Sequence, residues 1–278
     1  MKTCIIAIAK NENLYIKEWV QHHLKLGFDR IFICDNNNSG DEKISDVIDN
    51  ERVTILDYHD IRGVQTRAYT EQFLNNRDEY DWLAFIDIDE FIMLEPKYEG
   101  SIKNFLSDPL FEDAKIVRLY WKIYTTNTEL DVKNNDYSVV DRFKDVYLSG
   151  EENFSKPIIR GDVKWREDSY IDGAGLMMAP RNLELSADGR RAKADLIVGG
   201  REKKPQVYGN AWINHYPTKT IGEYVRQKWF RGGANNNDAT YSNFFHFYRY
   251  NERRPEVTEY GKKLVKEIEE KYKIRNQF

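Results

Sequence analysis

The sequence predicts an α/β protein built on a wound, mostly parallel sheet flanked by helices. Within the first ninety residues, four short apolar runs alternate with three segments of helical periodicity, which is the pattern of repeated strand–helix–strand units. Polar, turn-forming loops follow these runs, and in such sheets ligands bind at the carboxyl ends of the strands. We therefore expect the first hundred residues to form a Rossmann-like nucleotide-binding half.

The first strand is expected at Cys4–Ala9, and the helix that follows runs from Asn13 to Leu26 with Gly27 as its stop. The inner stripe of this helix, at helical spacing, consists of Ile16, Trp19, Val20, His23 and Leu24. The remaining elements of this half are a strand at Arg30–Cys34, a loop at Asp35–Asp41, a helix near Glu42–Ile48, a strand at Val53–Leu56, a helix near Val64–Asn76 and a strand from Trp82 to Ile86.

Beyond residue 100 the apolar pattern is less regular. The segment from Glu151 to Gly209 is rich in glycine and charge, which predicts loops and short strands. The more regular segments are a helix at Ser101–Ser107, a strand at Lys115–Tyr124, a strand or short helix at Val139–Tyr147, a strand ending before Pro217, a helix at Glu223–Phe230, a loop at Asn235–Asp238 and an amphipathic helix at Glu256–Lys273.

Composition excludes several classes of protein. The 42 basic and 46 acidic residues give a net charge of −4, so the chain has no overall basic field and we expect no nucleic-acid partner. Cys4 and Cys34 lie in apolar runs and predict buried thiols rather than a disulfide framework. The sequence shows neither a signal peptide nor 18 consecutive apolar residues. We expect a cytoplasmic protein with at most peripheral contact to a membrane.

Three carboxylates follow the apolar strand that begins at Trp82. Asp87 and Asp89 are two residues apart, which places them on one face if the chain stays extended. Two such carboxylates repel unless a hard divalent cation such as Mg²⁺ or Mn²⁺ lies between them, with water and substrate phosphates as its other ligands. This arrangement suits a nucleotide-dependent transferase, whereas the alternative is a solvated turn after a strand.

Several short motifs together resemble glycosyltransferases of the family 2-like and family 92-like groups. They are Lys10-Asn11-Glu12, Glu18-Trp19, His22-His23, Asp35-Asn36, Asp87-Ile88-Asp89-Glu90-Phe91 and Asn214-His215-Tyr216 with Lys219-Thr220. The resemblance extends from residue 5 to about residue 233. It implies an A-type glycosyltransferase fold, a nucleotide-sugar donor with a UDP-sugar favoured, Mn²⁺ or Mg²⁺ as cofactor, and transfer to a hydroxyl group, usually with inversion.

On this basis we expect a single glycosyltransferase domain over residues 1–278. Its parts are a nucleotide-sugar-binding half at 1–100, an acceptor and metal-completing half at 101–233, and a C-terminal helical extension at 234–278. The sequence shows no stem or membrane anchor, which favours a cytoplasmic enzyme with a glycan or lipid-linked glycan acceptor in the synthesis of surface polysaccharide or lipopolysaccharide. Possible sugar platforms are Trp121, Trp165 and Trp212.

The same resemblance implies residues that contact the nucleoside. Glu12 and Asp35 stand at the ends of the first two predicted strands, and their carboxylates can accept hydrogen bonds from a uracil imide or ribose hydroxyls. Arg67 is the candidate base-contacting arginine, with Arg62 as a competitor. The structural alternatives are that Asn11 or Glu12 caps the first helix and that Asp35 forms an Asx turn.

The metal and the leaving diphosphate have their own candidates. Asp89 and His215 are the predicted metal ligands, and Asp87 is expected to hold the ribose or a metal-bound water. The basic residues that could neutralise the diphosphate are Lys219, Lys228 and Arg231. The alternatives are a packed histidine and a solvated basic helix face.

Inversion calls for a carboxylate base that takes the proton of the acceptor hydroxyl. In the family 2-like enzymes that this chain resembles, the base lies well downstream of the D-x-D string, and the resemblance therefore implies Asp168 and Asp172 as candidates. Both could equally be surface acids. Two rival functions remain open. A nucleotidyltransferase would carry a glycine-rich phosphate loop after the first strand, where this chain has no glycine; a non-catalytic module would use the carboxylates only to hold Ca²⁺.

Overall fold

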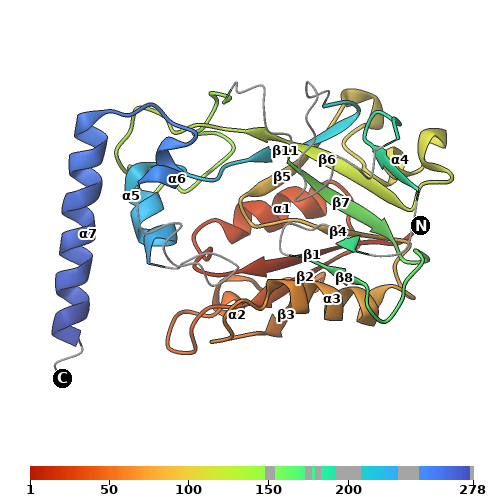
Figure 1. Ribbon diagram of the computed structural model, residues 1–278, viewed down its shortest axis with the longest axis horizontal. Helices are drawn as coiled ribbons and strands as arrows, with labels where there is room; N and C mark the ends of the chain where they lie inside the picture. The colour runs from red at the N-terminus through yellow and green to blue at the C-terminus, as the bar shows by residue number, and fades with distance from the viewer. Residues whose placement is uncertain (148–153, 173–176, 179–182, 192–207, 231–243, 276–278) are drawn as a thin grey trace. The chain divides into compact units, whose positions relative to one another are not determined.

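The computed structural model describes residues 1–147, 154–172, 177–178, 183–191, 208–230 and 244–275 (Figure 1). Its contacts divide the chain into two compact units. The first unit contains Met1–Lys122 and Leu148–His215, and the second contains Ile123–Tyr147 and Tyr216–Phe278. Each unit is built from two separate segments of the chain, with one boundary inside β6 and another at the end of β11.

The amino-terminal part of the first unit is the predicted parallel sheet. Its strands are β1 (Thr3–Ala9), β2 (Arg30–Asp35), β3 (Val53–Asp57) and β4 (Trp82–Phe85), in the spatial order β3-β2-β1-β4. All three of these pairings are parallel. The connecting helices are α1 (Ile16–Lys25), α2 (Ile44–Val47) and α3 (Gln65–Asn76). The alternation of strands and helices expected from the sequence is therefore confirmed.

The helices α1 and α3 cover opposite faces of this sheet (Figure 1). The buried residues of α1 are the five expected from helical spacing, namely Ile16, Trp19, Val20, His23 and Leu24. On the other face, Tyr69 and Phe73 of α3 pack with Phe85 of β4 in one hydrophobic cluster. Because both faces of the sheet are covered, β1 has almost no exposed side chains, which explains why its sequence is continuously apolar.

The sheet continues beyond β4 with strands from the later sequence. The path runs from β4 through β7 (Ser155–Arg160), β6 (Ile116–Ile123) and β11 (Ala211–His215) to β5 (Glu90–Leu94), and β10 (Glu184–Ser186) pairs with β6. β7 is antiparallel to both β4 and β6, and β11 is antiparallel to β5. In the part of the chain that is described, nine strands thus form one mixed sheet.

Smaller elements complete the first unit. They are η1 (Pro96–Tyr98), α4 (Ile102–Leu106), η2 (Pro109–Phe111) and the antiparallel pair β8 (Tyr170–Ile171) and β9 (Met177–Met178). The short strand β8 lies against α3, where the Ile171 N–H donates to Thr70 Oγ1 over 3.0 Å.

The second unit is mainly helical. Its elements are α5 (Ile221–Tyr224), the π-helical turn η4 (Val225–Trp229), α6 (Phe245–Tyr248) and α7 (Pro255–Arg275). Ile221, Tyr224 and Phe247 are the centre of its core, and α7 packs against them through Val257. The predicted C-terminal amphipathic helix is confirmed.

The prediction of a strand or short helix at Val139–Tyr147 is wrong. This segment is irregular apart from one bridge between Val146 and Tyr124. Val139 and Phe143 are both buried, so their spacing reflects contact with the core of the second unit rather than a regular element. The predicted loop at Asn235–Asp238 lies outside the described residues.

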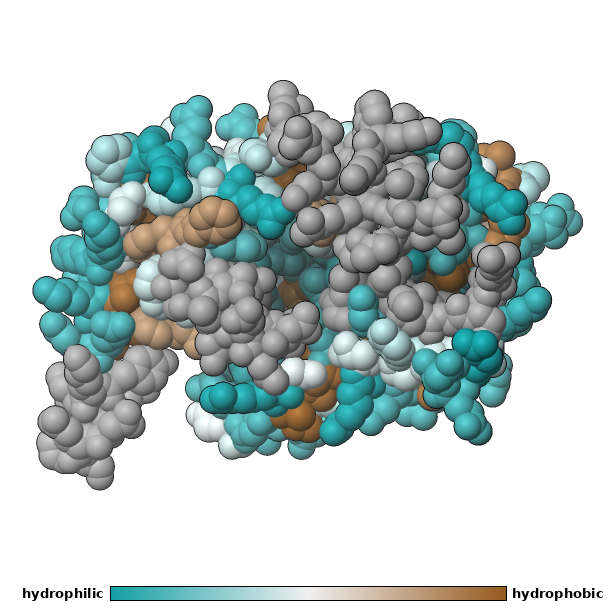
Figure 2. All heavy atoms as spheres, in the orientation of Figure 1, coloured by the Kyte–Doolittle hydropathy of each residue, from teal (hydrophilic) through white to brown (hydrophobic). Residues whose placement is uncertain are grey.

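The surface carries mainly hydrophilic side chains on the face shown in Figure 2. Exposed large apolar side chains, among them Leu74 and Phe245, come from separate elements. Across the described residues, no helix has both the length and the apolar character needed to cross a membrane.

Candidate functional site

The acidic string after β4 forms a tight turn rather than an extended strand end. β4 stops at Phe85, the Glu90 N–H donates to the Asp87 C=O over 3.1 Å, and β5 starts at Glu90. The extended arrangement considered for Asp87 and Asp89 is therefore not what the chain adopts. In this turn the side chains of Asp87 and Asp89 face different partners.

Asp87 is held by three side chains of the first unit. Its Oδ1 accepts hydrogen bonds from Gln65 Nε2 (3.0 Å) and Tyr69 Oη (3.1 Å), and its Oδ2 accepts from Lys156 Nζ (2.8 Å). Gln65 and Tyr69 lie one helical turn apart at the start of α3, so both face the turn. The Asp87 side chain nevertheless keeps 32% of its surface exposed, which leaves room for a ligand.

Glu90 is the fully buried member of the acidic string. Its Oε2 accepts from the Asp87 N–H (3.0 Å), and its Oε1 lies 3.7 Å from Lys156 Nζ, beyond hydrogen-bonding distance. Burial raises the pKa of Glu90 well above its ordinary value; Lys156 opposes this rise, while Asp87 and Asp89 add to it. Glu90 therefore contacts both the backbone of the turn and the ammonium group of Lys156.

Asp89 faces His215 instead. The Asp89 Oδ1 lies 3.6 Å from His215 Nε2, and both side chains are at least 90% buried. The register explains this contact, because β11 pairs with β5 so that His215 is directly opposite Glu90. The ring of Trp121 on β6 lies 4.2 Å from the His215 ring. The structure thus brings together the two residues predicted as metal ligands.

The Asp89–His215 pair is compatible with a divalent cation. Adjacent ligands that are each about 2.1 Å from an octahedral Mn²⁺ or Mg²⁺ ion lie about 3.0 Å apart. The observed separation of 3.6 Å would therefore have to shorten by about 0.6 Å when the ion binds. Across the described residues, no group of three or more His, Cys, Asp or Glu side chains is placed to hold a metal. The protein side chains therefore offer two ligands, and a metal at this place would need water or substrate oxygens for the rest.

Three side chains of α1 bond to the backbone of β5, which is the last strand of the sheet order among the described residues. Trp19 Nε1 donates to the Glu90 C=O (2.8 Å), and the Ile92 N–H donates to His23 Nε2 (3.2 Å). His22 Nε2 donates to the Ile92 C=O over 2.7 Å. These side chains take the place of a neighbouring strand, so the Trp19 and His22-His23 motifs fix the strand that begins directly after Asp89.

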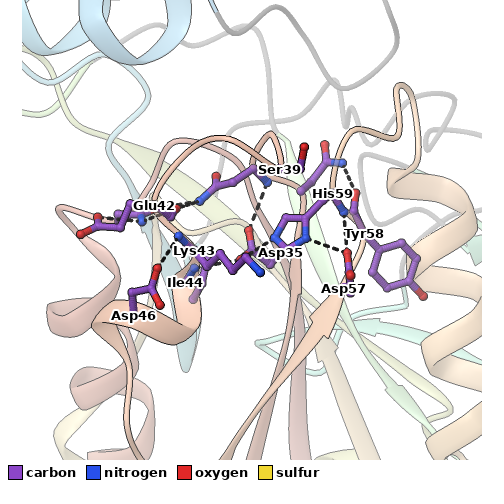
Figure 3. A network of polar contacts seen from close by, with 12 residues as sticks. Asp35, Ser39, Glu42, Lys43, Ile44, Asp46, Asp57, Tyr58 and His59 are labelled. Carbon is purple, nitrogen blue, oxygen red and sulfur yellow. Dashed lines mark hydrogen bonds and ion pairs between the residues drawn. The ribbon is translucent and has the colours of Figure 1, made fainter.

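Asp35, at the end of β2, is at the centre of a loop network (Figure 3). Its Oδ1 accepts from the Asn37 N–H (3.1 Å) and its Oδ2 from the Ile44 N–H (2.8 Å). His59 Nε2 is 3.1 Å from Oδ2, at ion-pair distance but without hydrogen-bond direction, and His59 Nδ1 is 2.8 Å from Asp57 Oδ1. Asp35 is 99% buried, so its observed contacts are those of an Asx-type turn that shapes the loop.

The loop after β1 is joined to the same network. Asn11 has a left-handed backbone (φ 56°), and its N–H donates to Asn37 Oδ1 over 2.8 Å. Glu12 is buried, and its backbone C=O accepts from the N–H groups of Tyr15 and Ile16 at the start of α1. The strand ends that carry Glu12 and Asp35 are therefore adjacent, as the sequence predicts, and their nucleoside-binding role stays a prediction.

Other candidates lie on the surface of the first unit. Arg67 pairs with Glu71 on the exposed side of α3 (3.1 Å), with 58% of its side chain exposed. Asp168 is 71% exposed and pairs with Arg166 (3.0 Å). Asp172 is half-buried just after β8. Among the described contacts these three residues share no site, and their roles stay predictions.

Two of the three predicted diphosphate-binding cations are buried in the second unit. Lys219 has a left-handed backbone (φ 53°), and its Nζ donates to Gln227 Oε1 over 3.3 Å. Lys228, on η4, is 5% exposed. Arg231 lies outside the described residues. The alternative of a solvated basic face is therefore wrong for Lys219 and Lys228.

Sequence reasoning did not identify the partners that hold Asp87 and Asp35. Gln65, Tyr69 and Lys156 surround the first carboxylate, and His59 contacts the second. The usable signal was Lys156, a charged residue directly before the apolar run Pro157-Ile158-Ile159, because a lysine that is buried in a strand requires a carboxylate partner.

Comparison with known proteins identifies relatives of this chain. A family model described as "Glycosyltransferase family 92" matches residues 1–162, more than half of the 278 residues. A family 92 protein of Oryza sativa subsp. japonica is 31% identical over 91 residues, which cover 32% of this chain and 16% of that protein. A family 92 protein of Ricinus communis is 32% identical over 109 residues, covering 36% and 19%. The aligned part therefore spans less than one fifth of these relatives.

Among solved structures, TarS 1-349 of S. aureus superposes on 95% of this chain and 71% of its own, with 11% identity and a TM-score of 0.39.

Proposed function

The chain belongs to glycosyltransferase family 92, and we propose that it transfers a sugar from a nucleotide-sugar donor to a hydroxyl group of a glycan. The observation that carries this proposal is the turn between β4 and β5, where Asp89 meets His215 while Asp87 is fixed by Gln65, Tyr69 and Lys156. The turn lies at the carboxyl end of β4, where wound sheets bind their ligands.

Asp89 and His215 would hold a Mn²⁺ or Mg²⁺ ion. When bound, the ion supplies positive charge that stabilises the departing diphosphate. Two protein ligands suffice for such an ion if the diphosphate and water fill its other positions, as is usual for Mg²⁺ sites at phosphates. The Trp121 ring lies beside the His215 ring, with 4.2 Å between the ring centroids.

Asp87 would bind the donor rather than the ion. Its exposed part can accept hydrogen bonds from ribose hydroxyls, while its two oxygens keep their direction through Gln65, Tyr69 and Lys156. Glu12 and Asp35 would stand on the nucleoside side of the donor, with Arg67 as the base contact. A UDP-sugar is the favoured donor.

The chemistry at the sugar needs cations at the leaving group and a base at the acceptor. We assign Lys219, Lys228 and Arg231 to the diphosphate. Asp168 or Asp172 would remove the proton of the acceptor hydroxyl while its oxygen bonds to the anomeric carbon and the bond to the diphosphate breaks on the opposite face. This single displacement would invert the anomeric configuration.

The proposed acceptor is a glycan or lipid-linked glycan of surface polysaccharide or lipopolysaccharide, and the proposed compartment is the cytoplasm. The two cysteines, Cys4 and Cys34, are buried free thiols, which accords with a reducing compartment.

A donor screen by thermal shift tests the proposal. Purified protein is melted with a panel of UDP-, GDP- and dTDP-sugars, each with and without Mn²⁺. A donor that binds only the folded protein raises the melting temperature. We expect one class of nucleotide sugar to do so only with Mn²⁺ present. A shift given by nucleoside triphosphates but by no nucleotide sugar would favour a nucleotidyltransferase instead.

A further inference from the structure

Lys156 is a buried cation that no step of the proposed transfer uses directly. It lies at the start of β7, with only 1% of its side chain exposed. In the antiparallel pairing of β7 with β4, Ile158 is opposite Ala84 and Ile159 is opposite Leu83, so Lys156 comes level with the chain just beyond the end of β4. The strand pairing therefore places the ammonium group of Lys156 at the turn that contains Asp87, Asp89 and Glu90.

The contacts of this ammonium group are directed to two of the three carboxylates. Lys156 Nζ donates to Asp87 Oδ2 over 2.8 Å and lies 3.7 Å from Glu90 Oε1. The Trp121 ring covers it from another side, with 5.8 Å between Nζ and the ring centroid. Burial alone would lower the pKa of Lys156, but Asp87 and Glu90 raise it above its ordinary value, so the group stays charged.

We infer that Lys156 is a positioning residue for the donor: its ammonium group fixes Asp87 Oδ2 while Glu90 fixes the Asp87 N–H, so that Asp87 presents a rigid carboxylate to the nucleotide. The inference rests on the proposed function of Asp87. Preorganisation of this kind lowers the cost of ordering a side chain when the ligand binds. Asp89 and His215, which contact each other, would be affected only indirectly.

Removal of Lys156 alone would leave Glu90 buried without a cation, and such a variant risks unfolding. The test variant is therefore Lys156→Met combined with Glu90→Gln, which removes the ammonium group and replaces the buried carboxyl group by an amide of nearly the same shape. Lys156→Arg is the conservative variant. Lys115→Met is the matched control, because Lys115 Nζ pairs with Asp162 (2.6 Å) on the surface of the same unit.

The measurements are the affinities of UDP, GDP and dTDP by calorimetry with Mn²⁺, the Mn²⁺ affinity by electron paramagnetic resonance, and KM and kcat for the donor. For the double variant we expect nucleotide affinity to fall about tenfold, the size of one hydrogen bond to a charged group. The donor KM should rise by the same factor, with Mn²⁺ affinity within about twofold of the unchanged protein. Lys156→Arg should keep most of the nucleotide affinity that the double variant loses. Lys115→Met should leave nucleotide affinity and the donor KM unchanged.

A mutant cycle with Asp87→Asn decides whether Lys156 acts through Asp87. In the Asp87→Asn background, the Lys156→Met and Glu90→Gln changes should lower nucleotide affinity by less than about twofold. The inference would be overturned if the losses of nucleotide affinity from the two sets of changes were fully additive. It would also be overturned if the double variant kept its nucleotide affinity and lost only melting temperature, or if the protein without any substitution bound none of the three nucleotides. If the protein binds a nucleotide and the changes at Lys156 and Asp87 are coupled, but no sugar is transferred, only the proposed function is refuted.

Discussion

Asp89 and His215 lie 3.6 Å apart because β5 and β11 pair in antiparallel register, with His215 opposite the residue after Asp89. The contact joins the turn after β4 to the end of a strand from the distant part of the sequence. The two ligands proposed for the metal are thus fixed by the sheet itself, and their separation does not depend on loop conformation.

His215→Gln should raise the Mn²⁺ concentration needed for half-maximal activity about tenfold or more without unfolding the protein. The amide keeps a polar group near Asp89 but is a much weaker metal ligand than imidazole. The measurements are Mn²⁺ titration of activity and the melting temperature. An unchanged Mn²⁺ requirement would remove His215 from the metal site and leave it as a packed histidine against Trp121.

The stability of the fold should fall as the pH decreases below about 6.5, the ordinary pKa of histidine. Burial lowers the pKa of His22 and lowers that of His23 much further. His23 accepts the Ile92 N–H at Nε2, which requires the neutral ring. The unfolded chain therefore binds protons below about pH 6.5 that the folded chain does not bind, so the free energy of unfolding decreases.

For the two histidines together, we expect a loss of about 1–3 kcal/mol between about pH 7.5 and about pH 5.5. Urea denaturation at both pH values measures it. His23→Gln, which has no titrating ring, should be less stable at neutral pH but should show a smaller pH dependence. Equal slopes for both proteins would contradict the assignment of this acid sensitivity to His23.

Asp35→Ala should destabilise the first unit by about 2–4 kcal/mol, because it leaves the N–H groups of Asn37 and Ile44 without their acceptor. Asp35→Asn keeps one acceptor oxygen and should cost less. Urea midpoints of the two variants provide the comparison. If both variants unfold at the same midpoint as the unchanged protein, Asp35 does not hold the loop, and a role in nucleotide binding alone would explain it better.

Arg142→Met should destabilise the second unit by about 3–5 kcal/mol. The Arg142 guanidinium binds Glu223 through two hydrogen bonds (2.6 and 3.0 Å), and Glu223 is almost fully buried. Glu223 also accepts from Thr220 at the start of α5. Combining Arg142→Met with Glu223→Gln should restore part of the lost stability. Amide hydrogen exchange would show whether the destabilisation lies in α5. Normal protection of α5 in Arg142→Met would show that this pair is dispensable.

Local sequence patterns were sufficient to predict the parallel half of the sheet. Alternating apolar and helical segments gave the strands and helices up to β4, and helical spacing gave the buried face of α1. These features depend on contacts between neighbouring elements. The proximity of Asp89 and His215 was also anticipated, but from the resemblance to a family rather than from any local pattern.

The geometry of the turn could not be predicted in the same way. A string of acidic residues after a strand is compatible with both an extended end and a turn, and the turn is stabilised by Lys156 and Gln65, which lie far away in the sequence. Strand β5 was missed because its partner β11 comes more than a hundred residues later. Long-range pairing of this kind leaves no periodic signal in a single sequence.

We propose that the turn between β4 and β5 binds a metal ion and a nucleotide sugar together. The most direct measurement is Mn²⁺-dependent release of nucleoside diphosphate from the donor selected by thermal shift, for the unchanged protein and for Asp89→Asn. We expect the release to require Mn²⁺ and to fall at least about a hundredfold in Asp89→Asn, while the melting temperature of this variant stays close to that of the unchanged protein. Equal release by both proteins, or release that persists without any divalent cation, would contradict it.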